Sequence, residues 1–269
     1  MADEHADTEG GAEPPPERRE PPEPSGQHPI ARMLLIDAIA SAIGVGLVLL
    51  IDWFPPVASS AAGPIDTLYH VTLVVAVPIF VLVMTVAIYS VIRFRARPDD
   101  TREGAPVHGS ARLEVVWVAV PFVIVSALAA YAWIVLDDIE ARSPDALRVD
   151  VRGQQFAWTF QYPQRGGPPV QSEQLVLPVG RQADFSIQAA DVIHSFWVPA
   201  FRIKQDAVPG IRTETRTTPT RTGTFGVVCA ELCGVGHATM RQTVRVLPQR
   251  EFGRWLASRR GGGGGGSPG

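Results

Sequence analysis

The segment FAWTFQY, residues 156–162, decides the fold class of the C-terminal half of the chain. Aromatic residues alternate here with small or polar ones, at Phe156, Trp158, Phe160 and Tyr162. Successive side chains of a β-strand point to opposite faces of the sheet, so this spacing places all four rings on one face. Such a face is typically buried in a core, which predicts β-structure in this region.

The sequence on both sides of this strand has the same character. Short apolar runs are separated by turn residues, and further strands are predicted at 174–180, 182–189, 223–230 and 242–248. An amphipathic segment at 248–260 predicts a closing helix with an apolar face formed by Phe252, Trp255 and Leu256. We therefore expect residues 146–260 to form one all-β domain, either a sandwich or a barrel.

Two uncharged segments before this domain are long enough to cross a bilayer as helices. They are VTLVVAVPIFVLVMTVAIYSVI at 71–92 and VVWVAVPFVIVSALAAYAWIVL at 115–136. About 20 apolar residues span the hydrocarbon core, and Pro78 and Pro121 are tolerated in a packed membrane helix. Residues 65–140 are expected to form a transmembrane hairpin in the lipid bilayer.

A third apolar segment, residues 34–51, leaves two interpretations open. It is apolar except for Asp37 and is nearly long enough to span a membrane. The small residues that follow, VASSAAG, would allow signal-peptide cleavage after Ala58 or Ala62, but the residues ahead of it are acidic and proline-rich rather than basic. Residues 33–54 are therefore expected to be either a signal sequence or an additional transmembrane helix.

Arginine placement predicts the orientation of the hairpin. Residues 52–70 contain neither lysine nor arginine, whereas the loop between the two apolar segments carries Arg93, Arg95, Arg97, Arg102 and Arg112. By the positive-inside rule this loop is cytoplasmic. The β-domain is then expected on the periplasmic or exterior side of a bacterial plasma membrane.

The two ends of the chain have compositions that cannot build a core. Residues 1–32 are rich in proline, glutamate and arginine, which predicts a disordered cytoplasmic tail. Residues 261–269, GGGGGGSPG, predict a flexible end. The net charge of −3 argues against nucleic acid as a partner.

The only two cysteines of the chain, Cys229 and Cys233, lie four residues apart in CAELCGVGHATM. In an exported domain, a disulfide is the simplest interpretation of such a pair. Here His237 and Met240 follow, so two thiols, an imidazole and a thioether lie within twelve residues. Thiolate and thioether are soft ligands and imidazole binds copper well, so the motif favours a copper site.

A further ligand is expected from elsewhere in the same domain. Of the six histidines, only His194 lies in the exported domain besides His237. A single blue-copper site would leave the second cysteine unexplained, and a zinc site would leave Met240 unexplained. Two copper ions bridged by both thiolates would use every one of these side chains.

CAELCGVGHATM, DVIHSFWVPAFRIKQDAVPG at 191–210 and the two preceding helices together resemble subunit 2 of the haem-copper cytochrome c oxidases, over about residues 65–258. The resemblance implies a cupredoxin-like β-barrel that holds the dinuclear copper centre CuA. The copper ligands that it implies are His194, Cys229, the backbone carbonyl of Glu231, Cys233, His237 and Met240. It also implies a magnesium ion that the side chain of Glu231 shares with subunit 1.

The resemblance implies that the chain is the electron-input subunit of an aa3-type respiratory terminal oxidase. The resemblance implies that the chain accepts electrons from cytochrome c and passes them to haem in subunit 1, where oxygen is reduced to water and protons are pumped. Subunit 3 is a further expected partner. Glu114 matches a carboxylate at the cytoplasmic mouth of a proton channel of subunit 1; an ordinary interfacial glutamate is the alternative.

One segment departs from the family pattern. The family strand usually reads GHQWYW, and its first tryptophan receives the electron, whereas this chain has GQQFAW. Phe156 stands at that electron-accepting position and Trp158 at the second tryptophan, so both are candidates for electron uptake. Gln161 replaces an acid of the family's docking face for cytochrome c, while Asp191 and Asp206 are retained.

Other functions fit the sequence less well. Subunit 2 of a quinol oxidase would have lost the copper ligands, and the chain contains no CxxCH motif for a c-type haem. A membrane-anchored copper carrier or oxidase assembly factor is the remaining alternative. Such a carrier would need one anchor and no carboxylate at the cytoplasmic membrane edge.

Overall fold

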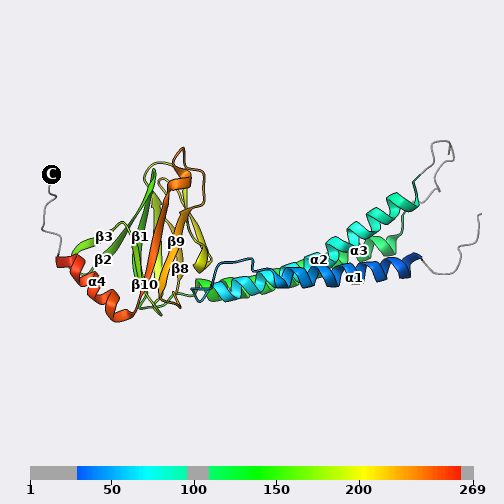
Figure 1. Ribbon diagram of the computed structural model, residues 1–269, viewed down its shortest axis with the longest axis horizontal. Helices are drawn as coiled ribbons and strands as arrows, with labels where there is room; N and C mark the ends of the chain where they lie inside the picture. Colours follow the sequence, from blue (N-terminus) through cyan, green and yellow to red (C-terminus); the bar gives the residue numbers. More distant parts are fainter. Residues whose placement is uncertain (1–28, 96–108, 262–269) are drawn as a thin grey trace, which may run out of the picture.

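The computed structural model describes residues 29–95 and 109–261, which form a group of long helices joined to a β-domain (Figure 1). The long helices are α1 (Pro29–Leu50), α2 (Ala62–Arg93) and α3 (Ala111–Glu140). Most of the tail predicted at 1–32, nearly all of the flexible end predicted at 261–269 and most of the arginine-rich loop lie outside the described residues.

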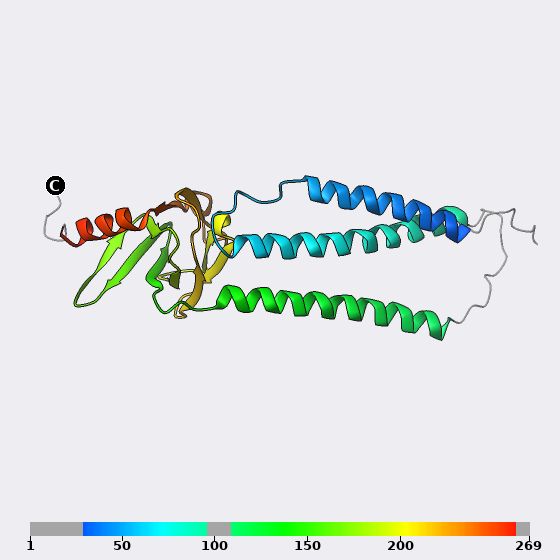
Figure 2. The ribbon, with the colours of Figure 1, turned by 90° about the horizontal axis from the view of Figure 1, so that it is seen from below.

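Each of the three long helices has the length and hydropathy needed to cross a membrane. Figure 2 shows them extending from the same end of the β-domain, with α2 next to α1. The two helices approach closely at Gly44, where a Cβ atom would lie 2.8 Å from Cγ1 of Val77. A small residue at a contact of this kind lets two membrane helices pack backbone to side chain.

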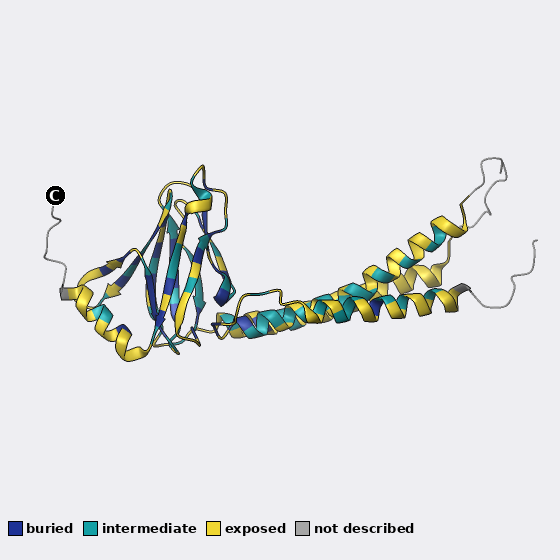
Figure 3. Ribbon diagram, in the orientation of Figure 1, coloured by how far each residue is buried: buried dark blue, intermediate teal, exposed yellow. Residues whose placement is uncertain are grey.

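The helices and the β-domain differ in burial (Figure 3). Most side chains of the three helices are exposed in the isolated chain, whereas the strands alternate between buried and exposed positions. A helix that is apolar all round meets lipid or another membrane subunit. The alternation in the strands is that of sheets with one face in a core.

Two five-stranded sheets make up the β-domain. Their strand orders are β3-β2-β1-β5-β8 and β4-β10-β9-β6-β7. The strands are β1 (Leu147–Gln154), β2 (Ala157–Gln164), β3 (Gly167–Ser172), β4 (Leu175–Pro178), β5 (Ala183–Ala189), β6 (His194–Val198), β7 (Ile203–Ala207), β8 (Thr213–Thr217), β9 (Gly223–Cys229) and β10 (Arg241–Leu247). Strands β1 and β5 pair in parallel, as do β4 and β10, and the other pairs are antiparallel. This is a cupredoxin-like domain, as the family resemblance implied.

The predicted aromatic strand lies in the core of this domain. Trp158, Phe160 and Tyr162 project from β2 and are at most 1% exposed. The ring of Phe196, from the other sheet, lies 5.5 Å from that of Trp158. Phe156 precedes β2 in the β1–β2 turn and is only half-buried, so three of the four predicted rings fill the core. The closing helix is α4 (Gln249–Gly261), which packs on the domain far from the long helices (Figure 1).

The linker between α1 and α2 is built into the β-domain. The backbone N–H of Ala58 donates to the carbonyl of Ala200, and the N–H of Thr220 donates to the carbonyl of Ala58, both at 3.0 Å. Ala58 and Ala62 have no exposed surface. Both residues after which signal cleavage was considered are therefore enclosed by the folded domain.

Arg202 stabilises the junction between the β-domain and α2. Its backbone is left-handed, with φ 56°, and its guanidinium donates to both carboxylate oxygens of Asp66 in α2, at 2.7 and 2.9 Å. It also donates to the carbonyls of Pro55 and Pro199, at 2.7 Å each, and lies 4.8 Å from the centre of the Phe54 ring. Two parallel bonds between a guanidinium and a carboxylate fix direction as well as distance, so the β-domain is held in one orientation on α2.

Candidate metal centre

The predicted metal ligands meet at the end of the β-domain opposite the α1–α2 linker. His194 begins β6 and Cys229 ends β9, next to it in the same sheet. Cys233, His237 and Met240 lie in the β9–β10 loop, the orange segment that follows β9 in Figure 1. The strand pairing therefore places one histidine beside a loop that brings the other ligands.

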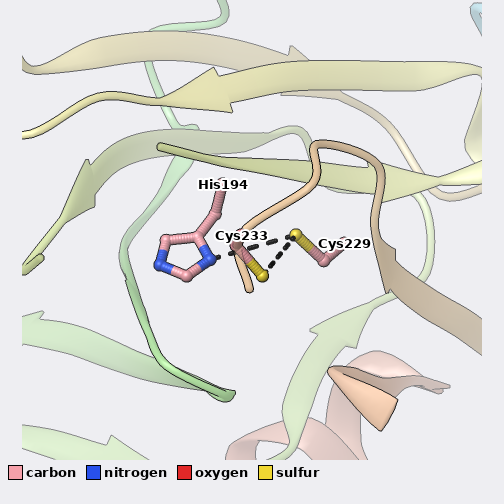
Figure 4. A group of neighbouring side chains, drawn as sticks. All are labelled: His194, Cys229 and Cys233. Atoms are coloured by element: carbon pink, nitrogen blue, oxygen red, sulfur yellow. Dashed lines mark hydrogen bonds between the residues drawn. The ribbon is translucent and has the colours of Figure 1, made fainter. Parts of the chain in front are cut away.

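Two thiols form the middle of the cluster. Figure 4 shows Cys229 and Cys233 with their sulfur atoms turned toward each other and His194 beside them. The two Sγ atoms are 3.8 Å apart, and both cysteines are free and buried. A disulfide would need about 2.05 Å, so the structure holds a pair of thiols.

Each thiol has its own set of neighbouring donors. The Sγ atom of Cys229 lies 3.9 Å from Nδ1 of His194 and 3.3 Å from the backbone carbonyl oxygen of Glu231. For Cys233, the neighbours are Nδ1 of His237 at 3.7 Å and the sulfur of Met240 at 3.8 Å. The structure thus brings together all six donors that the sequence resemblance implied. Two of them are the cysteine sulfurs, and each sulfur has two of the other four donors beside it.

Burial sets the electrostatics of the thiols. His194 and Met240 are completely buried, and Cys233 is 4% exposed. Burial, together with the neighbouring Cys229, raises the pKa of Cys233 to about 11. Without a metal the Cys233 thiol is therefore protonated at neutral pH, and a cation must displace its proton. His237 is half-exposed and faces the surface side of the cluster.

A carboxylate outside the predicted set holds His194. Oδ1 of Asp191 lies 2.8 Å from Nε2 of His194 and accepts the N–H of Val192 at 2.7 Å. Oδ2 accepts the backbone N–H of Gln155 at 2.8 Å. Partial burial opposes ionisation, but the hydrogen bonds from Gln155, His194 and Val192 outweigh it and lower the pKa of Asp191 to about 2. The only sequence signal for this role is the spacing of three residues before His194.

The β1–β2 turn covers the ligand loop. The amide Nε2 of Gln155 donates to the carbonyl of Cys233 at 2.7 Å. The ring of Phe156 lies so close to the loop that a Cβ atom at Gly236 would approach it to 2.4 Å, and one at Gly234 to 3.2 Å. Glycine is therefore needed at both positions for the turn and the loop to meet.

Trp158 touches the cluster from the interior. Its ring lies 5.9 Å from that of His194, in an edge-to-face arrangement, and it is 1% exposed. Gly153 lets them meet, since a Cβ atom there would be 3.0 Å from Trp158 and 3.1 Å from His194. Of the two residues considered for electron uptake, Phe156 is half-buried whereas Trp158 has almost no exposed surface.

Two predicted residues point away from the cluster or lie far from it. The side chain of Glu231 is exposed, although its carbonyl faces Cys229. Glu114 is exposed in the first turn of α3, at the end of that helix away from the β-domain. The structure therefore separates Glu114 from the metal ligands by the length of α3.

Comparisons with known proteins match both parts of the chain. The family described as cytochrome c oxidase subunit II, transmembrane domain, matches residues 40–135, and the family described as cytochrome c oxidase subunit II, periplasmic domain, matches residues 170–247. Cytochrome c oxidase subunit 2 of Synechocystis sp. is 30% identical over 274 residues, covering 82% of either chain. That of Thermostichus vulcanus is 34% identical over 255 residues, covering 75% of this chain and 76% of its own.

Solved structures include one of a periplasmic domain by itself. The periplasmic domain of subunit II of cytochrome oxidase from Bradyrhizobium japonicum is 32% identical, with a TM-score of 0.42. The match covers 44% of this chain and 96% of that domain.

Proposed function

Because the chain belongs to the cytochrome c oxidase subunit 2 family, we propose that it is the electron-input subunit of an aa3-type respiratory oxidase. It accepts electrons from cytochrome c at a dinuclear copper centre and passes them to haem in subunit 1, where oxygen is reduced to water and protons are pumped. The observation that carries this proposal is the pair of free, buried thiols with an imidazole nitrogen beside each sulfur.

The donor set suits two copper ions. Thiolate and thioether sulfur are soft ligands, and imidazole binds copper well. A blue-copper site would use one thiolate, and a tetrahedral zinc site would leave the sulfur of Met240, 3.8 Å from Cys233, without a role. Held by these residues, a copper pair would supply a one-electron carrier whose charge is shared by two metals.

The β-domain itself fixes the positions of the ligands. His194 and Cys229 stand on paired strands, which are more precise supports than loops. Burial of Cys229, Cys233 and Met240 excludes water from the interior side of the cluster. Because the ligands are fixed and dry, gain or loss of an electron requires little rearrangement of the protein.

Electron uptake is assigned to the side of the cluster where Phe156 lies. Phe156 is half-buried and rests on the ligand loop, so a docked cytochrome c can contact it. Trp158 has almost no surface and supports His194 from the interior. In this assignment Phe156 contacts the donor, and Trp158 keeps the imidazole in position.

We assign the contacts with the other subunits to the helices and to two exposed carboxylates. We assign α2 and α3 as anchors in the bacterial plasma membrane, with the metal centre on the exported side, against subunit 1 and near subunit 3. The exposed side chain of Glu231 is free to share a magnesium ion with subunit 1. Glu114, exposed at the other end of α3, is free to serve a proton channel of subunit 1.

Copper loading of the full-length chain in detergent tests the proposal. With both thiols reduced, we expect two copper ions per chain and a seven-line mixed-valence EPR spectrum. Cys233→Ser should abolish that spectrum, whereas Thr239→Ala, which removes no candidate ligand from the same loop, should retain it. One copper per chain with a four-line spectrum, or none, would refute a dinuclear site. Copper binding without copurification of a haem-containing subunit would instead indicate a copper carrier.

A further inference from the structure

We propose that Asp191 is a positioning residue of the copper centre, whose carboxylate fixes the orientation and tautomer of His194 and ties the ligand loop to the β1–β2 turn. This inference rests on the proposed function and deepens it. It also gives Asp191 a different role from the one that the family resemblance implies, which is docking of cytochrome c.

The first step concerns the proton on His194. A carboxylate has no hydrogen to donate, so the 2.8 Å contact between Oδ1 of Asp191 and Nε2 of His194 places the imidazole proton on Nε2. Nδ1 then keeps its lone pair, and this is the nitrogen that faces Cys229 Sγ at 3.9 Å. Asp191 therefore selects the tautomer in which the nitrogen beside the thiols is free to bind a metal.

The second step concerns the orientation of the ring. His194 is completely buried, and its ring is bounded by Trp158 at 5.9 Å and by the backbone of Gly153. These apolar contacts limit tilt, but neither can distinguish the two ring nitrogens. The polar contact with Asp191 supplies that distinction, because rotating the ring by 180° about χ2 would move both nitrogens away from their partners.

The third step connects Asp191 to the loop that carries Cys233. Oδ2 of Asp191 accepts the backbone N–H of Gln155 at 2.8 Å, and the side chain of the same Gln155 donates to the carbonyl of Cys233 at 2.7 Å. One residue of the β1–β2 turn therefore bridges the support of His194 and the loop that carries Cys233. Asp191 positions ligands on both sides of the cluster through this chain of hydrogen bonds.

The same contacts argue against docking as the main role of Asp191. Both carboxylate oxygens accept hydrogen bonds from inside the domain, and the side chain is 28% exposed. Asp206, the other retained acid, contacts no ligand. Both residues, Asp191 and Asp206, are exposed, but the carboxylate of Asp206 accepts the hydroxyl of Ser195, at 2.7 Å. Asp206 is therefore a matched control, a carboxylate of the same family face that does not touch a candidate metal ligand.

Three full-length variants in detergent test the inference: Asp191→Ala, Asp191→Asn and Asp206→Asn. Loss of an outer carboxylate that orients a ligating histidine typically weakens metal binding about 10- to 100-fold. We expect Asp191→Ala to show a loss of copper affinity of this size in competition with a chelator, together with altered copper hyperfine splitting in EPR. Asp191→Asn retains an oxygen that can accept from His194 and Val192 but loses the acceptor for Gln155, so it should lie between Ala and wild type. Asp206→Asn should leave copper affinity and spectrum unchanged.

A second readout needs no copper. In the metal-free chain labelled with ¹⁵N-histidine, we expect His194 of the wild type to give the imidazole shifts of a single Nε2–H tautomer and Asp191→Ala to give a mixture. Unchanged copper affinity, EPR spectrum and tautomer in Asp191→Ala, with only a raised KM for cytochrome c, would overturn the inference and leave Asp191 as a docking residue. Failure of the wild type itself to bind two copper ions would refute the proposed function instead, so the two failures are distinguishable.

Discussion

The Sγ atoms of Cys229 and Cys233 lie 3.8 Å apart with no bond between them, inside the buried end of the β-domain. This separation is too long for a disulfide and allows a metal ion to contact both sulfurs. Metal uptake should therefore require that both cysteines are reduced.

Oxidation of the two thiols should therefore block copper loading. A disulfide would bring the sulfurs to about 2.05 Å and remove both thiolate ligands. We expect the metal-free chain to show two reactive thiols in a DTNB assay under denaturing conditions, and an oxidised sample to show none and to bind no copper until it is reduced. Copper binding of the oxidised sample at two ions per chain would contradict this.

Copper affinity should rise with pH. Burial and the neighbouring Cys229 raise the pKa of Cys233 to about 11, so this thiol is protonated across the neutral range and copper must displace the proton. For one displaced proton, apparent affinity increases about tenfold per pH unit below that pKa. Chelator competition at pH 6, 7 and 8 measures the slope, and a flat profile would mean that the thiols are already ionised.

The same pKa shift has the opposite effect on the stability of the metal-free chain. Because folding raises the pKa of Cys233 above its ordinary value, its contribution to stability is fully present below about pH 9, the ordinary thiol value, and is lost as pH rises toward 11. The free energy of unfolding should therefore decrease between pH 9 and pH 11 in the metal-free wild type and by less in Cys233→Ala. Equal pH dependence of the two proteins would argue against this contribution.

Phe156 and Trp158 should have separable effects on electron uptake. Phe156→Leu removes a ring that has exposed surface, so it should chiefly raise KM for cytochrome c. Trp158→Phe leaves the surface intact but alters the packing around His194, so it should chiefly lower kcat and change the copper spectrum. Steady-state oxidation of cytochrome c and EPR on both variants distinguish these results; a raised KM alone in Trp158→Phe would contradict the assignment.

Substitutions of Arg202 and Asp66, which form an ion pair, should have strongly coupled effects on stability. The two side chains are 6% and 17% exposed, and loss of one partner of a buried pair typically costs about 3–5 kcal/mol. We expect Arg202→Gln and Asp66→Asn each to lower the thermal midpoint of the full-length chain, and the double variant to lower it by much less than the sum. Additive effects would show that the two residues stabilise the junction independently.

Helix α1 should remain in the mature chain. It packs on α2 at Gly44, and Ala58 and Ala62, the residues after which cleavage was considered, have no exposed surface. Intact-mass measurement of the protein purified from membranes should therefore give a mass that includes residues 33–54. A mature chain beginning at Ser59 or Gly63 would show instead that cleavage precedes folding.

Much of the fold could be predicted from local patterns. Alternation of aromatic residues located β2, and uninterrupted apolar runs located α2 and α3. Five of the ten strands, β1, β3, β6, β7 and β8, were not predicted. For β3 the reason is that Pro168 and Pro169 are poor strand formers, but β3 lies at the edge of its sheet, where a missing backbone N–H costs little.

The ligands could be predicted more readily than the residues that hold them. Cys229, Cys233, His237 and Met240 are close in sequence, and His194 was the only other histidine of the exported domain. The hydrogen bonds that join Asp191, Gln155 and the Cys233 carbonyl connect three loops. The local sequence pattern does not predict which loops lie next to one another in the folded domain. Small residues occur both at signal-cleavage sites and where a chain is closely packed. The sequence around Ala58 therefore does not distinguish a cleavage site from a buried linker.

The burial of Ala58 in the core of the β-domain has a consequence for biogenesis. A residue that precedes α2 supplies backbone hydrogen bonds to segments around Ala200 and Thr220, which are synthesised more than a hundred residues later. Docking of the α1–α2 linker onto the β-domain therefore follows the synthesis of these later segments. The contact between the helices and the β-domain is thus completed late, and the orientation of the domain on α2 is fixed only after the segment around Thr220 has been made.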